Sequence, residues 1–135
     1  LKRRFLWLLA HPAVARTGPV LIPAVRAWLR WRYRRLARRL AREVADYDRS
    51  GFETVAVVGV AGSPSCGVET TVDLTTAVGA IAAGRGRPVT VRRLNEEVVG
   101  GAVIPGRGLW IEVLTAELHR RGLAVPLTEY RLEDP

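Results

Sequence analysis

Apolar residues at spacings of three and four run through the N-terminal half of the chain. Between residues 22 and 48 they are Val25, Leu29, Tyr33, Leu36, Leu40, Val44 and Tyr47. This is the period of one face of an α-helix. Pro23 suits a first helical turn, and Ser50-Gly51 provides a stop. The pattern predicts a long amphipathic helix over residues 22–48.

A different pattern follows in residues 55–60, which read Val-Ala-Val-Val-Gly-Val. A continuous run of small and β-branched residues is typical of a strand that is buried on both faces of a parallel sheet. In open α/β sheets, ligands bind just beyond the carboxyl ends of such strands. The loop of residues 62–67, Gly-Ser-Pro-Ser-Cys-Gly, is therefore expected where a binding site would lie.

Shorter elements are expected in the rest of the chain. The pattern predicts a helix over residues 75–83, a strand over 89–91, a turn at 95–97, a helix over 108–121 and a strand over 125–130. In the 108–121 helix we expect Glu112 and Glu117 to face outward. The inward positions are Leu109, Ile111, Val113, Leu114 and Leu118. Together these elements predict a single α/β domain over residues 1–135, with a small, mostly parallel sheet flanked by helices in a Rossmann-like three-layer arrangement.

Charge is distributed unevenly along the chain. Residues 1–49 carry 13 Lys or Arg and 3 acids, a net charge of +10, whereas residues 50–135 carry 8 and 10, a net charge of −2. Arginines recur at a spacing of four on the long helix, at Arg26, Arg30, Arg34, Arg38 and Arg42, joined by Arg32, Arg35 and Arg39. They form either a solvated surface or, with Arg30, Arg34 and Arg38 at its centre, a surface for the phosphates of a nucleotide or RNA. Trp28 and Trp31 flank them and could stack on bases, although tryptophans on a helix face more often belong to the core.

Composition narrows the class of protein. A hydrophobic content of 48% excludes global disorder, and a single cysteine excludes a disulfide framework and fits a reducing cytoplasm. Residues 1–15 resemble a secretory signal, but their apolar run is only six residues long. No segment approaches the ~20 apolar residues of a membrane span. We therefore expect a cytoplasmic protein without a membrane partner.

Four common loop motifs do not fit residues 62–67. A phosphate-binding loop needs Lys-Ser/Thr after its second glycine, where this chain has Val68-Glu69. A nucleophile elbow needs Gly-x-Ser-x-Gly, a phosphatase-type loop needs arginine where Val72 stands, and a thioredoxin-like pair needs a second cysteine. What the loop does offer is the pair of hydroxyls of Ser63 and Ser65 beside the sulfur of Cys66. It is either a site for a thiolate or a bound anion, or the surroundings of a buried, inert cysteine.

The Gly62-Ser63-Pro64-Ser65-Cys66-Gly67 segment resembles the Ser-Pro-Ser-Cys-Gly motif of the 2-thiouracil desulfurase (TudS-like) family. Other segments resemble the desulfidase-related branch of that family, and the matches span residues 20–130. These segments are Asp46-Tyr47, Gly51, Val58-Gly59-Val60 and Pro105-Gly106-Arg107-Gly108.

The resemblance implies an α/β fold and a [4Fe-4S] cluster that is held by three cysteines and removes sulfur from a thiolated base. Cys66 would be a cluster ligand with Gly67 beside it, and Ser63 and Ser65 would bond to cluster or substrate sulfur. The substrate side of the site would include Gly62, Glu69, Gly106 and Gly108. This chain has one of the three cysteines and begins at Leu1. We therefore expect either a truncated member that lacks two ligands or a relative that binds no cluster.

Two further features are candidate parts of a site. Glu69 and Asp73 are the acids nearest to the cysteine in sequence, and they are either proton donors or solvated loop residues. Gly106 and Gly108 precede the 108–121 helix, where they either leave backbone N–H groups free for an anion or form an ordinary turn. His11 and His119 are far apart in sequence and make no convincing metal pair.

Overall fold

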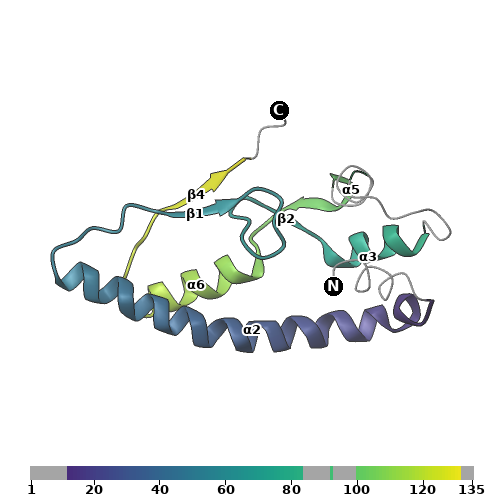
Figure 1. Ribbon diagram of the computed structural model, residues 1–135, viewed down its shortest axis with the longest axis horizontal. Helices are drawn as coiled ribbons and strands as arrows, with labels where there is room; N and C mark the ends of the chain where they lie inside the picture. The colour runs from purple at the N-terminus through teal and green to yellow at the C-terminus, as the bar shows by residue number, and fades with distance from the viewer. Residues whose placement is uncertain (1–11, 84–91, 93–99, 132–135) are drawn as a thin grey trace.

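The computed structural model describes residues 12–83, 92 and 100–131 (Figure 1). In chain order the elements are α2 (Pro12–Arg49), β1 (Val57–Val60), β2 (Thr70–Val72), α3 (Leu74–Ala83), α5 (Gly100–Ala102), β3 (Val103–Pro105), α6 (Leu109–His119) and β4 (Leu127–Tyr130). The expected strand at 89–91 and turn at 95–97 lie outside these residues. Figure 1 shows α2 along one side of the molecule, with α6 between α2 and the strands.

The strands form two ladders. β1 pairs with β4 in parallel, with Val57 opposite Leu127 and Val60 opposite Tyr130. β2 pairs with β3 in antiparallel fashion, with Thr70 opposite Pro105. The expected α/β class, a small parallel sheet flanked by helices in a single small domain, is confirmed.

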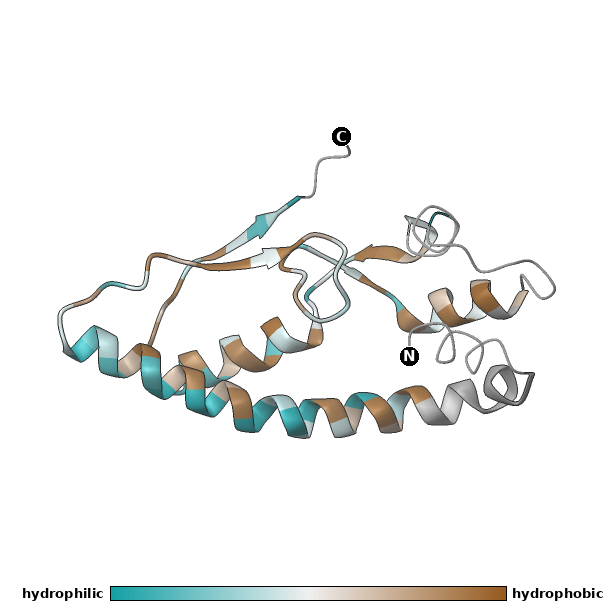
Figure 2. Ribbon diagram, viewed as in Figure 1, coloured by the Kyte–Doolittle hydropathy of each residue, from teal (hydrophilic) through white to brown (hydrophobic). Residues whose placement is uncertain are grey.

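The burial expected for the first strand is wrong. The side chain of Val58 is 65% exposed, and Val55 and Val60 are exposed as well. Within the described residues the helices cover only one face of β1, because α2 and α6 pack from the same side. Figure 2 shows the hydrophobic colour of the segment that leads into β1.

The long helix exists, but it begins earlier than expected. α2 starts at Pro12, so Pro23 lies within the helix and not in its first turn. Its expected end is confirmed, since the backbone N–H and the hydroxyl of Ser50 both donate to the carbonyl of Asp46, at 3.1 and 2.8 Å. Among the described residues, no helix is both long and apolar enough to cross a membrane.

The main core lies between α2 and α6. Ala37 and Ala41 are completely buried on α2 and pack in one cluster with Val113, Leu114 and Leu118 of α6. All the inward positions expected for α6 are buried. On α2 the expected face is only partly right, because Val25, Leu36 and Tyr47 are exposed. Two alanines one turn apart carry the contact instead, and their small side chains let the two helices approach closely.

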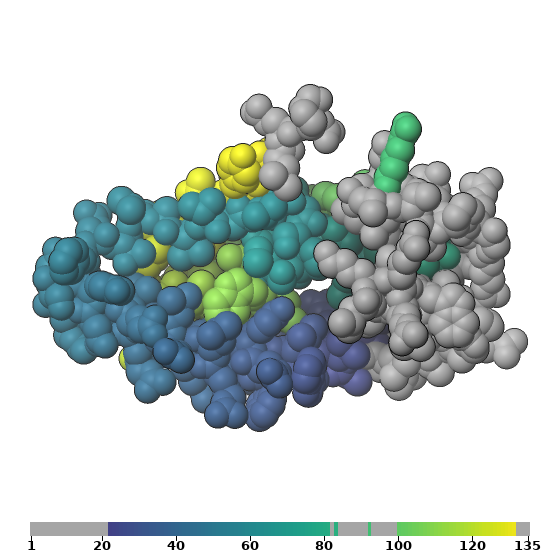
Figure 3. Space-filling model, in the orientation of Figure 1, coloured from purple at the N-terminus to yellow at the C-terminus, as the bar shows by residue number. Residues whose placement is uncertain are grey.

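Glu117 is not outward-facing as expected. Its side chain is 7% exposed and lies 3.5 Å from the Arg38 guanidinium and 2.5 Å from that of Arg120. A second pair links the same helices, with Arg30 2.7 Å from Glu112. The explanation is charge pairing across the helix contact, because a carboxylate can be buried when basic groups satisfy it. Figure 3 shows α6 exposed in part between α2 and the segments above it.

The first prediction concerns this contact. Ala41→Leu should lower the free energy of unfolding by about 1–3 kcal/mol, because extra methylene groups at a fully packed position force the helices apart. Urea unfolding measures the change. Ala27→Leu, at an exposed position of the same helix, is the matched control and should change the stability by less than about 0.5 kcal/mol. Equal stability of the two variants would contradict close packing at Ala41.

Candidate functional site

The cysteine loop follows β1 and closes on itself through hydrogen bonds. The N–H of Val60 donates to the carbonyl of Cys66 at 3.0 Å, and the N–H of Gly67 donates to the carbonyl of Ser63 at 3.1 Å. The N–H of Cys66 donates to the Ser63 hydroxyl oxygen at 3.1 Å. These bonds hold the loop in one conformation at the carboxyl end of a strand, where the sequence predicted it.

The start of α6 is docked on this loop. The N–H groups of Leu109 and Trp110, at the beginning of the helix, donate to the carbonyls of Pro64 and Ser65 at 3.2 and 2.9 Å. The N–H of Gly108 donates to the carbonyl of Gly67 at 2.9 Å. The first N–H groups of a helix have no partner within the helix, and here the loop supplies their acceptors.

This docking corrects one expectation. The N–H groups of Gly106 and Gly108 are not free for an anion, since Gly106 donates to the carbonyl of Glu69 at 2.8 Å and Gly108 is bonded as above. Gly108 is required for a different reason. A β-carbon there would collide with the Ser65 backbone, and one at Gly67 would collide with the carbonyl oxygen of Thr70. Both positions therefore need a residue without a side chain.

The sulfur of Cys66 is partly buried and has a single serine beside it. The Ser65 hydroxyl oxygen lies 3.4 Å from the sulfur. The Ser63 hydroxyl instead lies 3.4 Å from that of Ser65 and accepts the Cys66 N–H. The sequence predicted two hydroxyls beside the sulfur. In the structure the Ser65 hydroxyl contacts the sulfur, and the Ser63 hydroxyl contacts that of Ser65.

The loop is also tied to the far strand of the parallel sheet. The N–H of Gly62 donates to the Thr70 hydroxyl at 2.9 Å, and that hydroxyl donates to a carboxylate oxygen of Glu129 on β4 at 2.8 Å. Burial opposes ionisation of Glu129, but the hydrogen bonds from Thr70 outweigh it and lower the pKa of this carboxyl. Glu129 was not among the predicted site residues, because its partner lies 59 positions away in sequence.

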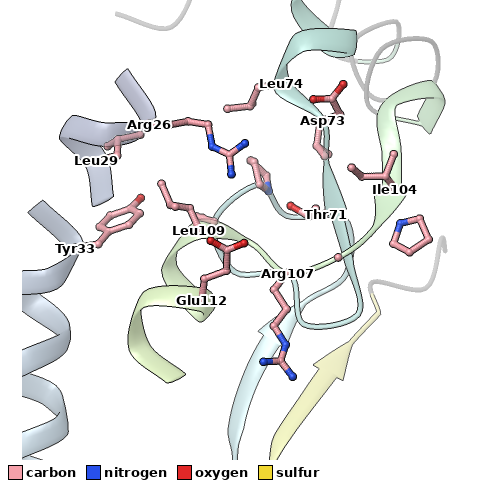
Figure 4. Close-up of a pocket in the computed structure, with 15 residues that line it drawn as sticks. Arg26, Leu29, Tyr33, Thr71, Asp73, Leu74, Ile104, Arg107, Leu109 and Glu112 are labelled. Carbon is pink, nitrogen blue, oxygen red and sulfur yellow. The ribbon is translucent and has the colours of Figure 1, made fainter. Parts of the chain in front are cut away.

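An open cavity of about 440 Å³ lies next to the loop, between α2, the loop, the β2–β3 ladder and the start of α6 (Figure 4). Of the predicted site residues, Ser65 and Gly106 line this cavity. Its lining does not include Cys66, Ser63, Gly62, Gly67, Glu69 or Gly108. The structure holds the loop residues together, but most of them do not line the cavity.

Sequence reasoning missed the side chains that give this cavity its chemistry. They are Arg26, Tyr33, Thr71, Arg107 and Glu112. Figure 4 shows the Arg26 guanidinium reaching into the middle of the cavity, with Tyr33 at one side and Asp73 at the other. In the sequence, Arg26 is one of many similar arginines and Tyr33 is one residue of an apolar stripe, so no local signal separated them from their neighbours.

Asp73 caps a helix at the edge of the cavity. Its carboxylate accepts the hydroxyl and backbone N–H of Thr76 and the N–H of Thr75, at the start of α3. These bonds, the Thr76 hydroxyl first, together with the charge of Arg26, lower the pKa of Asp73 below its usual value. Glu69 is exposed, lies 3.7 Å from Arg131 and is outside the cavity. Of the two acids, only Asp73 therefore lines the cavity.

The residues present do not fit a three-thiolate iron–sulfur cluster. The whole chain contains one cysteine. In the part of the chain that the structure describes, no three His, Cys, Asp or Glu side chains are grouped so that they could hold a metal ion. Clusters of this kind are held by cysteine thiolates, so this chain by itself supplies one ligand of the implied set.

The second prediction follows from this ligand count. Anaerobic reconstitution of the chain with iron and sulfide should leave it colourless, with an iron content far below one cluster per chain. Visible absorption and iron analysis after gel filtration measure this, and a Cys66→Ser variant run in parallel gives the background. A brown monomer with four irons per chain, absent from the variant, would show that other groups complete a site.

The third prediction concerns the cap at Asp73. Asp73→Ala should lower the free energy of unfolding by about 1 kcal/mol at pH 7, since α3 loses its N-cap. The folded-state pKa is lowered, so the contribution is complete above the usual pKa of 3.8 and is lost as the pH falls through the lower folded value.

Urea unfolding of wild type and Asp73→Ala between pH 7 and pH 2.5 measures this. Asp48→Ala, at an exposed position near the C-terminal end of α2, is the control and should not destabilise the protein. A difference between wild type and Asp73→Ala that grows toward low pH would contradict the assigned cap.

Comparisons of the chain with protein-family models, with curated proteins and with solved structures gave no match. The desulfurase resemblance therefore depends on the motifs around Cys66 and Gly108.

Proposed function

We propose that this domain binds a small thiolated heterocycle, such as a thiolated pyrimidine, in the cavity beside the cysteine loop, as part of a desulfidase-type carbon–sulfur cleavage. Within that reaction the part assigned to this chain is to bind the ring and to hold its sulfur near Ser65 and Cys66. The bond-breaking step is not assigned to it, because the chain supplies a single thiolate.

One observation carries the proposal: Ser65 connects the cavity with the thiol of Cys66. It lines the cavity, and its hydroxyl lies 3.4 Å from the Cys66 sulfur. A ligand atom that contacts the Ser65 hydroxyl is therefore one group away from the only thiol of the chain. The loop that carries both residues is fixed by the start of α6, so this spacing is set before any ligand binds.

The size and the apolar walls of the cavity suit a single ring. A volume of about 440 Å³ lies at the small end of the range for ligand sites, about 300–1,000 Å³. Leu29 and Tyr33 of α2 and Leu109 of α6 contribute the apolar surface. The Tyr33 ring is held edge-on against Trp110, with ring centroids 5.5 Å apart. A braced aromatic ring of this kind offers a planar ligand a surface that costs little entropy to order.

The polar groups suit a ring that carries both hydrogen-bond donors and acceptors. Arg26 presents only N–H donors, which match a carbonyl or thiocarbonyl group. Asp73 and Glu112 carry carboxylate oxygens, which match ring N–H groups. A thiolated pyrimidine places such groups next to one another around its ring, whereas a purely apolar or purely anionic ligand would leave one set unpaired.

The fourth prediction tests this site by calorimetric titration with 2-thiouracil. The wild-type chain should bind it, and Arg26→Gln should weaken binding about tenfold or more, because a charge-assisted hydrogen bond contributes roughly 1.5–3 kcal/mol. Arg39→Gln is the matched control. It removes the same charge from the same helix, where Arg39 is exposed and pairs with Glu43, and should leave binding unchanged.

Titration with uracil under the same conditions measures how much of the affinity depends on sulfur. Absence of 2-thiouracil binding at millimolar concentration would contradict the proposal, as would equal weakening by Arg26→Gln and Arg39→Gln.

A further inference from the structure

Two tryptophans on α2 lie on the surface rather than in the core. Trp28 is 55% exposed and Trp31 is 56% exposed. They are three residues apart, about 60° around the helix and about 4.5 Å along it. Together with Arg32, Arg35 and Leu36 they line an open groove on α2. We call Trp28, Trp31, Arg32 and Arg35 the tryptophan–arginine face.

Each of these tryptophans has an arginine over its ring. The guanidinium carbon of Arg32 lies 5.3 Å from the Trp28 ring centroid, and that of Arg35 lies 6.0 Å from the Trp31 ring centroid. Cation–π contacts at this distance hold the long arginine side chains close to the aromatic rings. The face therefore presents planar aromatic surface and positive charge side by side.

The arginines of α2 differ in their partners. Arg30 and Arg38 turn to α6, where they pair with Glu112 and Glu117. Arg39 and Arg49 pair with acids of α2 itself. For Arg32, Arg34 and Arg35, the described part of the chain contains no acidic side chain within ion-pair distance.

This difference in pairing changes where on α2 we expect phosphates to bind. In the row centred on Arg30, Arg34 and Arg38, two members already pair with acids of α6, so this row has less positive charge to offer to phosphates. The tryptophan–arginine face, by contrast, carries two arginines that have no acidic partner among the described residues. The acids of α2 (Glu43, Asp46 and Asp48) are all in its C-terminal part, so a polyanion would be attracted to the half of the helix that carries the tryptophans.

We propose that the tryptophan–arginine face binds single-stranded nucleic acid, with unpaired bases stacked on Trp28 and Trp31 and phosphates held by Arg32 and Arg35. Sites for single strands combine positive charge that follows the backbone with aromatic side chains on which bases stack. Duplex nucleic acid offers phosphates but keeps its bases inside. It would therefore contact the arginines of this face without stacking on its tryptophans. This inference is independent of the cavity and of the function proposed for it.

An anionic membrane surface is the main competitor for such a face. Helices that lie on membranes present a continuous apolar side that inserts between lipids. Here Arg32 and Arg35 lie over the tryptophan rings themselves, and the apolar neighbours Val25 and Leu36 do not form a side free of charge. The interleaving of charge with aromatic rings favours a ligand that is itself both charged and aromatic.

The fifth prediction tests this with fluorescence anisotropy of labelled 12-nucleotide oligo(U) and oligo(dT), titrated with the whole chain at low ionic strength. Both should bind more tightly than a 12-base-pair duplex, and affinity should fall as salt is raised. Trp28→Ala/Trp31→Ala should weaken single-strand binding at least tenfold while changing the salt dependence little. Arg32→Gln/Arg35→Gln should reduce the slope of log affinity against log salt by about 1.4, since each lost phosphate contact on a single strand contributes about 0.7.

The matched control is Arg49→Gln/Arg131→Gln, which removes two charges from exposed arginines that already pair with acids. It should leave the slope nearly unchanged. Circular dichroism establishes that each variant is folded, and 2-thiouracil titration of the tryptophan variant should match wild type, which separates this result from the cavity.

Several outcomes would overturn the inference. They are absence of single-strand binding at low salt, duplex binding as tight as single-strand binding, unchanged affinity in the tryptophan variant, and equal slopes for the two arginine variants. Binding to phosphatidylserine vesicles without binding to either oligonucleotide would assign the face to a membrane surface instead.

Discussion

The arrangement of this domain depends on how the first turn of α6 satisfies its backbone N–H groups. Their acceptors are the carbonyls of Pro64 and Ser65, supplied by a loop that lies more than forty residues earlier in the chain. This joins the end of β1 to the beginning of α6. Since α6 in turn packs against α2 through Ala37 and Ala41, the loop, the cavity and the long helix hold fixed positions relative to one another.

The side of α2 that faces α6 differs in its charge pairing from the side that carries the tryptophans. A row of arginines at a spacing of four would repel itself in an isolated helix. In the folded domain, Arg30 and Arg38 offset part of that repulsion by binding Glu112 and Glu117 on α6. The pairing allows a carboxylate to be buried in the main core. Arg32 and Arg35, which pair with no acid among the described residues, lie instead next to two exposed tryptophans.

The parts predicted from sequence are those governed by short-range patterns. The inward face of α6, the end of α2 and the loop directly after β1 follow from helical period and glycine placement. The parts that failed depend on which segment lies opposite. Glu117 could not be assigned to the interior without knowing that Arg38 faces it, nor Val58 to the surface without knowing that helices cover one side of β1. The cavity could not be predicted for the same reason, because its lining residues come from several segments between Arg26 and Glu112.

The close backbone contacts at Gly67 and Gly108 limit what a short sequence motif can show about common ancestry. A side chain at either position would collide with a neighbouring part of the backbone. Any chain that folds its strand, loop and helix together in this way has to keep glycine there, whatever chemistry it performs. The glycines of the Ser-Pro-Ser-Cys-Gly and Pro-Gly-Arg-Gly segments are therefore required by this backbone path and do not by themselves indicate a shared reaction. Only Ser65 and Cys66, which the path does not require, carry information about a shared reaction.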